Sequence, residues 1–355
     1  MATSRFNRWT AGCLTAQLAV ALGCASPHVP GADAQMPNGR RVLIEAITAM
    51  RNEALGRERI GWDELASRLQ EKIDAGAPAK DAWPLIEEAV SALNDPHARF
   101  LPATPPTPSA STASRSTDAP RATPTIPEEP VGRMLNDEIA YVMVPLRGDA
   151  DAAVLRAYAK KSRSVIAALA QDSPRGWIID LRLNGGGTMW PMFLGMRPLL
   201  GDGVHLTSIS GGRVVATFGV SGGEAWIDHG SGRQVQLSLP REEDAPLVVP
   251  GAKIAVLLGP WTMSSGEALA IAFSALPNVR SFGEHTGRLS TVTQRYTLSD
   301  GSVLILPVSV MADRFGRAFP DGIAPDERVA IGDWPTDDDE VAHAARRWIT
   351  QPSDR

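Results

Sequence analysis

Apolar residues in the first third of the chain recur at the spacing of amphipathic helices. Three stripes with intervals of three and four residues lie between Asn38 and Leu101, which predicts short helices packed against one another. The stripes consist of Leu43, Ile44, Ile47 and Met50, then Trp62, Leu65, Leu69 and Ile73, and finally Trp83, Leu85, Ile86, Val90 and Leu93. We therefore expect residues 38–102 to form a small helical domain.

The pattern changes after Val131, where short apolar runs alternate with longer helical stretches. The expected strands are 139–145, 176–183, 253–259 and 303–311, the expected helices are 150–171 and 338–350, and a glycine-rich, hairpin-like stretch covers 204–239. Strands that alternate with long helices predict an α/β domain with crossover connections. We place this core at 131–335 and a C-terminal helical segment at 336–355.

Between these two regions, residues 103–130 are dominated by Pro, Ser, Thr and Ala. Such a composition cannot bury enough apolar surface to offset the entropy of ordering the chain. The stretch therefore predicts an extended linker or a flexible loop. No internal repeat is visible in the chain.

The amino-terminal segment has the pattern of an export signal. Arg5 and Arg8 precede an apolar run over residues 11–23, and Cys24 follows with no acidic residue before it. The run is short for a membrane span, which favours cleavage. The segment before Cys24 resembles a lipoprotein signal, which implies cleavage before Cys24 and a lipid on its thiol. Residues 24–37 would then form a tether. Because Ala25 offers no retention signal of the aspartate type, we expect anchoring to the outer membrane on its periplasmic side. Cleavage after Ala34 would instead release the protein by ordinary secretion.

The amino-acid composition indicates a globular protein and argues against several classes of function. The chain has 355 residues, 43 % of them hydrophobic, which is enough for a sizeable core and two domains. Loss of residues 1–23 would remove two of the 35 basic residues and none of the 40 acidic ones, so an acidic balance argues against nucleic acid as a partner. Both cysteines, Cys13 and Cys24, lie in or beside the leader, which leaves no pair for an internal disulfide. No zinc-type or phosphate-binding motif is present, and we expect no metal and no cofactor.

A serine lies at the joint between a buried strand and a helix. The strand ends at Gly259, and apolar residues from Ala268 onward follow helical spacing, so Ser264 lies at a helix N-terminus. Unpaired N–H groups at such a place stabilise the negative charge that develops in acyl transfer. A plainer interpretation is a Ser-x-x-Glu capping box of Ser264 with Glu267.

A second candidate element follows the strand at 176–183. Three glycines, Gly185 to Gly187, come directly after Asn184, at the carboxyl end of a strand, where open α/β sheets bind ligands. Glycines there allow backbone N–H groups to approach an oxyanion closely. A tight turn without a ligand is the alternative.

Six short motifs together resemble one family. Their order is that of the carboxyl-terminal processing (tail-specific) serine peptidases and the related tricorn core protease. The motifs are LNDPH at 93–97, DLRLNGGG at 180–187, TMSSGE at 262–267, FGEHTG at 282–287, LSDGS at 298–302 and GIAPD at 322–326. The resemblance implies a crotonase-like β/α core, Ser264 as the nucleophile, and an oxyanion hole formed by the N–H groups of Gly185, Gly186 and Ser265.

The chain departs from the processing peptidases in two respects. The 103–130 stretch stands where those enzymes usually carry a PDZ domain, and no lysine follows Lys253, which excludes a downstream Ser/Lys dyad. A histidine is then the expected proton acceptor. His97 matches the position where histidine-using relatives such as tricorn place their base, His285 is the local rival, and Asp321 could orient the imidazole.

These features bear on three possible functions. The leading prediction is an exported serine-type peptidase that hydrolyses protein or peptide substrates through a Ser264/His97 dyad. The second is a catalytically silent binding protein on the same scaffold, comparable to the interphotoreceptor retinoid-binding proteins. An ordinary α/β-hydrolase esterase is disfavoured because Thr262 stands where the Gly-x-Ser-x-Gly elbow has its first glycine.

Overall fold

The fold is taken from a computed structural model that describes residues 38–103, 127–136, 138–148, 151–240, 251–332 and 336–352. The predicted export signal, Cys24, the tether and most of the predicted linker lie outside these residues. None of the described helices combines the length and the apolar character needed to cross a bilayer.

The expected helical region is present. It consists of α1 (Gly39–Glu53), α2 (Trp62–Gln70) and α3 (Trp83–Ala92), with short 3₁₀ turns η1 (Arg57–Arg59) and η2 (Ala79–Ala82) between them. Asn38 caps α1, because its side chain accepts a hydrogen bond from the Arg41 amide. One expected core residue is wrong: Ile44 is 42 % exposed, since the neighbouring Leu43 and Ile47 already define the buried face of α1.

The core contains a six-stranded sheet in the order β13-β10-β9-β4-β3-β2. All neighbours in it are parallel except β2 and β3. Its strands, in chain order, are β2 (Val131–Leu135), β3 (Ile139–Met143), β4 (Gly176–Asp180), β9 (Lys253–Leu258), β10 (Val279–Gly283) and β13 (Glu327–Arg328). The α/β class predicted from the alternating pattern is confirmed.

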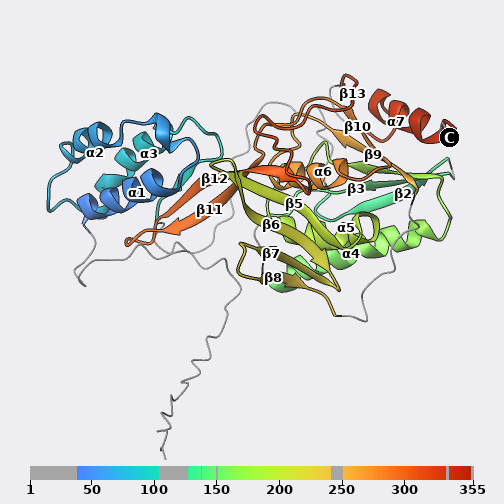
Figure 1. Ribbon diagram of the computed structural model, residues 1–355, viewed down its shortest axis with the longest axis horizontal. Coiled ribbons are helices and arrows are strands. Elements are labelled where there is room, and N and C mark those ends of the chain that lie inside the picture. Colours follow the sequence, from blue (N-terminus) through green and yellow to red (C-terminus); the bar gives the residue numbers. More distant parts are fainter. Residues whose placement is uncertain are drawn as a thin grey trace, which may run out of the picture.

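Helices cover both faces of this sheet (Figure 1). On one face, alternate residues of β4 and β9 pack against α4 (Ala152–Ala170), α5 (Met189–Leu200) and α6 (Ser265–Ser274). On the other, Ile178, Ala255 and Leu257 pack against α7 (Glu340–Thr350). Burial on both faces explains why these strands are apolar without alternation.

A second sheet joins the helical region to the core. It runs β1-β12-β5-β6-β7-β8, with β11 also paired to β12. Its strands are β1 (Arg99–Leu101), β5 (Gly203–Ser210), β6 (Arg213–Ser221), β7 (Glu224–Asp228), β8 (Arg233–Ser238), β11 (Thr291–Thr297) and β12 (Val303–Asp313). The β11–β12 hairpin reaches from the core to the helices, and Phe100, Tyr296 and Leu304 share one cluster with them (Figure 1).

This arrangement places the end of the helical region against the core. Because β1 pairs antiparallel with β12, with Phe100 opposite Leu304, the segment before β1 lies beside β12. The chain therefore folds back over the long sequence separation between residues 93–97 and the serine motif.

Candidate active site

Ser264 occupies a tight turn between β9 and α6. Its backbone has φ 51° and ψ −115°, a conformation that costs a residue with a side chain of order 1–3 kcal/mol. The turn is packed closely, since a Cβ on Gly266 would lie 2.4 Å from the backbone oxygen of Asn184. Ser264 itself is only half-buried. A strained strand-to-helix turn of this kind presents a serine hydroxyl to a ligand.

Glu267 holds the backbone around the serine. This side chain is fully buried, and its carboxylate accepts from the Ser264 amide at 2.9 Å and from the Leu289 amide at 2.8 Å on one oxygen. The other oxygen accepts from the Thr286 hydroxyl at 2.6 Å and from the Arg288 amide at 3.1 Å. Burial raises the pKa of the Glu267 carboxyl, and these four donors oppose that shift.

The glycine turn packs directly on the serine. Gly186 has φ 104°, and a Cβ built there would lie 2.7 Å from Cβ of Ser264, so the site has room only for glycine. Asn184 fixes this turn: its side chain donates to the Val144 oxygen at 3.0 Å, and its backbone oxygen accepts from the Met263 amide at 3.0 Å. The structure therefore brings together the two strand ends that the sequence separates.

The candidate oxyanion donors differ in availability. The Gly186 amide donates to the Asn184 side-chain oxygen at 3.1 Å and is already engaged. In the described part of the chain, the amides of Gly185 and Ser265 have no hydrogen-bond acceptor. Ser265 is the first residue of α6, and Gly185 is partly exposed. These two N–H groups are the ones free to bind an oxyanion.

His97 lies two residues before β1. It is 9 % exposed, its amide donates to Asp95, and its Nδ1 lies 2.7 Å from the hydroxyl of Thr291 on β11. Burial lowers the pKa of the imidazole, an effect that Asp95 opposes and Arg99 reinforces. Among the described residues, Nε2 of His97 has no hydrogen-bond partner and no hydrogen bond joins His97 to Ser264.

The other two expected residues lie differently. His285 is half-buried, and its Nδ1 lies 2.9 Å from the backbone oxygen of Thr286. Asp321 is exposed and makes no hydrogen bond with His97 within the described residues. The partner of Nδ1 of His97 in the described residues is Thr291, not the Asp321 that we expected.

Sequence reasoning missed Asn184 and Thr291, and it treated Glu267 only as a cap. An asparagine directly before a glycine run is a usable signal, because short amides often fix tight turns. Thr291 carried no such signal, since its partner lies 194 residues away.

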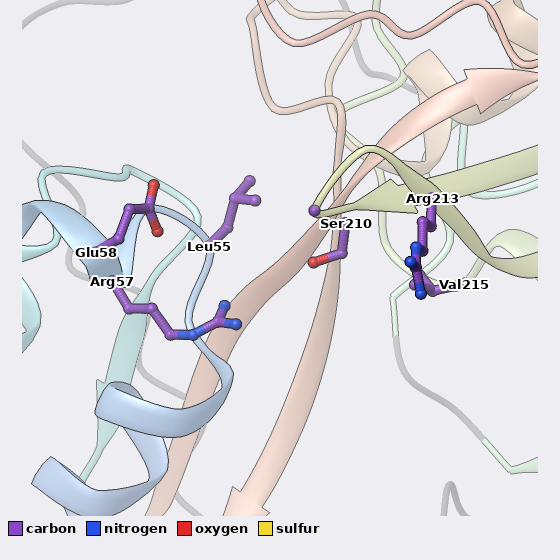
Figure 2. Close-up of a pocket in the computed structure, with 8 residues that line it drawn as sticks. Leu55, Arg57, Glu58, Ser210, Arg213 and Val215 are labelled. Atoms are coloured by element: carbon purple, nitrogen blue, oxygen red, sulfur yellow. The ribbon is translucent and has the colours of Figure 1, made fainter.

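A separate cavity of about 570 Å³ lies between the helical region and the β5–β6 hairpin (Figure 2). Leu55, Arg57 and Glu58 border it from the helical side, and Ser210, Arg213 and Val215 border it from the hairpin. None of the candidate catalytic residues lines it. Within the described residues, no group of three or more His, Cys, Asp or Glu side chains is arranged to hold a metal ion.

The sequence profile of peptidase family S41 matches residues 138–329, more than half of the chain, and the chain belongs to that family. This match confirms the resemblance inferred from the motifs. The fold and the family together identify a serine-type peptidase.

Individual proteins of known sequence or structure are similar to this chain. The nisin-resistance protein of Lactococcus lactis subsp. lactis is 33 % identical over 159 residues, which are 44 % of this chain and 47 % of that protein. The match therefore spans about half of the length of that curated relative. A lipoprotein from Streptococcus agalactiae has a TM-score of 0.64 at 20 % identity, covering 90 % of this chain and 99 % of its own. The photosystem II D1 C-terminal processing protease has a TM-score of 0.56 at 14 % identity, covering 83 % of this chain and 94 % of its own.

Proposed function

We propose that this chain is an exported serine endopeptidase in which Ser264 is the nucleophile and His97 the base. The observation that carries the proposal is the contact between the strained Ser264 turn and Gly186, because Ser265 and Gly185, the chain neighbours of these two residues, have unpaired N–H groups. A simple capping serine requires no second glycine turn packed against it. The accessible, half-buried position of Ser264 supports the same role.

The proposed reaction follows the usual order of acyl transfer. Nε2 of His97 takes the Ser264 proton as Oγ attacks the scissile carbonyl carbon. The carbonyl oxygen becomes an oxyanion bound by the N–H groups of Gly185 and Ser265. The imidazolium then gives its proton to the leaving amine. Water next attacks the acyl carbon while Nε2 takes one of its protons, and the imidazolium returns that proton to Oγ of Ser264 as the acid product leaves. Catalytic hydrogen bonds are often long without substrate, so the dyad contact would tighten on binding.

The proposed substrates are proteins or peptides with an apolar side chain near the scissile bond. Leu146 and Met263 flank the glycine turn, each with a carbon 3.7 Å from the Cβ position of Gly185. Leu146 is 45 % exposed and available to a ligand. Because one relative is a nisin-resistance protein, nisin is the first substrate to test.

Labelling with a fluorophosphonate probe tests the nucleophile. The wild-type protein is expected to be labelled, Ser264→Ala to lose both labelling and hydrolysis, and Ser274→Ala at the far end of the same helix to retain both. His97→Ala should lose nearly all turnover, whereas His285→Ala should keep most of it. Trapping with Ser264→Ala then identifies bound protein substrates.

The absence of a dyad hydrogen bond favours one alternative, a catalytically silent binding protein on this scaffold. A folded wild type that resists the probe at every pH, yet binds peptides, would establish that alternative.

We also propose that Cys24 carries a lipid and holds the mature chain at the outer membrane, facing the periplasm. The cationic start, the apolar run and the cysteine support this, as does the likeness to a chain described as a lipoprotein. Ala25 offers no retention signal of the aspartate type. Cys24→Ser should abolish lipid labelling and release the protein. A Cys24→Ser protein that stays lipid-labelled and membrane-bound would contradict the anchor, and a mature chain that begins after Ala34 would indicate secretion.

A further inference from the structure

We propose that Thr291 is the positioning residue of His97, where many serine peptidases use a carboxylate. This inference rests on the proposed role of His97 as the base. Nδ1 of His97 and Oγ1 of Thr291 are 2.7 Å apart, and the two residues are 9 % and 8 % exposed. A buried contact of this length is a strong hydrogen bond whose loss would leave a ring nitrogen unpaired.

The backbone around Thr291 fixes where its hydroxyl lies. Thr291 opens β11 and pairs with Val310 of β12. Its side chain is β-branched, which restricts χ1. The preceding Ser290 donates its hydroxyl to the Phe319 oxygen and accepts the Met311 amide at 2.9 Å on its backbone oxygen. The hydrogen bonds of Ser290 and the pairing of Thr291 with Val310 therefore fix the position of the Thr291 backbone.

Glu267 relates this position to the nucleophile. The same carboxylate oxygen accepts from the Ser264 amide and from the Leu289 amide, two residues before Thr291. The turn that holds the proposed nucleophile and the backbone just before β11 are therefore both hydrogen-bonded to a single buried oxygen of Glu267. Any displacement of one backbone segment against the other would break one of those two hydrogen bonds.

The hydroxyl selects the tautomer that the reaction needs. A threonine hydroxyl can donate or accept, but Nδ1 must carry its hydrogen if Nε2 is to have the free lone pair. In that tautomer Nδ1–H donates to Oγ1 of Thr291, and Nε2 is left without a partner in the described part of the chain. The same bond persists when Nε2 takes the serine proton, because Nδ1 remains a donor in the imidazolium. Thr291 therefore serves both states without placing a second buried charge at the site.

Imidazole NMR of His97 and enzyme kinetics test this role together. In the wild type, two-bond ¹H–¹⁵N spectra above the titration of His97 should show hydrogen on Nδ1. Thr291→Val keeps the shape and removes the hydroxyl. The Thr291→Val variant should lose that tautomer. Its kcat should be about 10- to 100-fold lower, with little change in KM. The acid limb of kcat should move to lower pH, because the imidazolium loses the acceptor of its Nδ1 hydrogen. Thr291→Ser should restore most of the rate, and Thr293→Val on the same strand should match the wild type.

Each outcome decides a separate point. A wild-type His97 with its hydrogen on Nε2 overturns the positioning role whatever the activity. If His97→Ala is inactive but Thr291→Val keeps the wild-type rate and pH limb, the dyad stands and the role of Thr291 is wrong. If Thr291→Val has a lower melting temperature but an unchanged acid limb, the positioning role is also wrong, because that result indicates a purely structural contact. Full activity in His97→Ala contradicts the proposed function and this inference with it.

Discussion

At the residue scale, the site is organised by backbone conformations that side chains normally avoid. Ser264 has a positive φ, and it packs against Gly186, whose own φ is 104°. Strain of this kind persists only where the surrounding structure fixes it, and here the Glu267 carboxylate and the Asn184 backbone do so. The energy stored at Ser264 is a cost of presenting the hydroxyl.

That strain is measurable by substitution. Ser264→Gly should be as stable as Ser264→Ala or more stable, by up to about 2 kcal/mol, because glycine accepts this φ while alanine does not. Both variants should be inactive. Urea unfolding of the two variants checks this, and a Ser264→Gly protein about 1 kcal/mol less stable than Ser264→Ala would show that the turn is unstrained.

The acidity of His97 sets the pH dependence of the proposed reaction. Burial holds the pKa of the imidazole below its usual value near 6.5, and the base acts only when neutral. The rate should therefore fall as pH drops through a pKa below 6.5, and more than half of the maximum should remain at pH 6.5. Profiles of kcat/KM at constant ionic strength test this. His285→Ala should leave the limb in place, whereas a limb centred above pH 7 would be contrary to the expectation.

At the element scale, α6 and the loop from Thr286 to Thr291 act as one unit through Glu267. The helix begins at the Ser264 turn, the loop leads into β11, and the carboxylate between them accepts four hydrogen bonds. The loop also binds the 322–323 segment, because the Thr286 hydroxyl accepts from the Ile323 amide at 2.8 Å. These elements position the site as a group.

Removal of one acceptor oxygen from the Glu267 side chain should lower the free energy of unfolding. In Glu267→Gln, an NH₂ group replaces one oxygen and faces two donors, for example the Ser264 and Leu289 amides. We expect a loss of about 2 to 4 kcal/mol in the free energy of unfolding, together with reduced turnover. Glu327→Gln is the matched control, since its ion pair with Arg280 is 40 % exposed on each side and should contribute less than about 1 kcal/mol. Equal losses in the two variants would count against the special role of Glu267.

At the scale of the whole molecule, two long-range connections hold the parts together. The pairing of β1 with β12 seats the helical region on the core, supported by the Trp83 indole, which donates to Asp300 at 2.9 Å. The second connection is made by Arg182, which is fully buried and donates to Asp180 at 2.6 Å and to Asp339 at 2.5 Å. Asp339 is the N-cap of α7, so Arg182 joins the C-terminal helix to the end of β4.

Loss of Arg182 should weaken the whole fold. Arg182→Met would leave the 2 % exposed Asp180 carboxylate with the Tyr141 hydroxyl and the residue 182 amide but without its charge partner. Breaking a buried pair in this way costs about 3 to 5 kcal/mol. Thermal and urea unfolding should show this loss, whereas Arg175→Met, which breaks an exposed pair with Glu138, should stay within about 1 kcal/mol. An Arg182→Met protein as stable as Arg175→Met would show that the network adds nothing.

The sequence alone determined the parts of the molecule that depend on neighbouring residues. The strand before Ser264, the helix after it and the glycine turn after β4 were predictable, because periodicity and turn residues act over a few positions. The helical region and the C-terminal helix were predictable for the same reason. The helix α5 was not expected, because Pro191, Gly195 and Pro198 interrupt its pattern. The strand β1 was not expected either, because it is only three residues long.

Only the tertiary structure decided which of these parts meet. The Gly186 amide is engaged by Asn184, the free amides are those of Gly185 and Ser265, and the partner of His97 is Thr291 rather than Asp321. Each of these assignments depends on how backbone from β4, β9, β11 and β12 packs at one place. Such contacts join residues up to 194 positions apart, and no local pattern in the chain encodes which donor will find which acceptor once the sheets have formed.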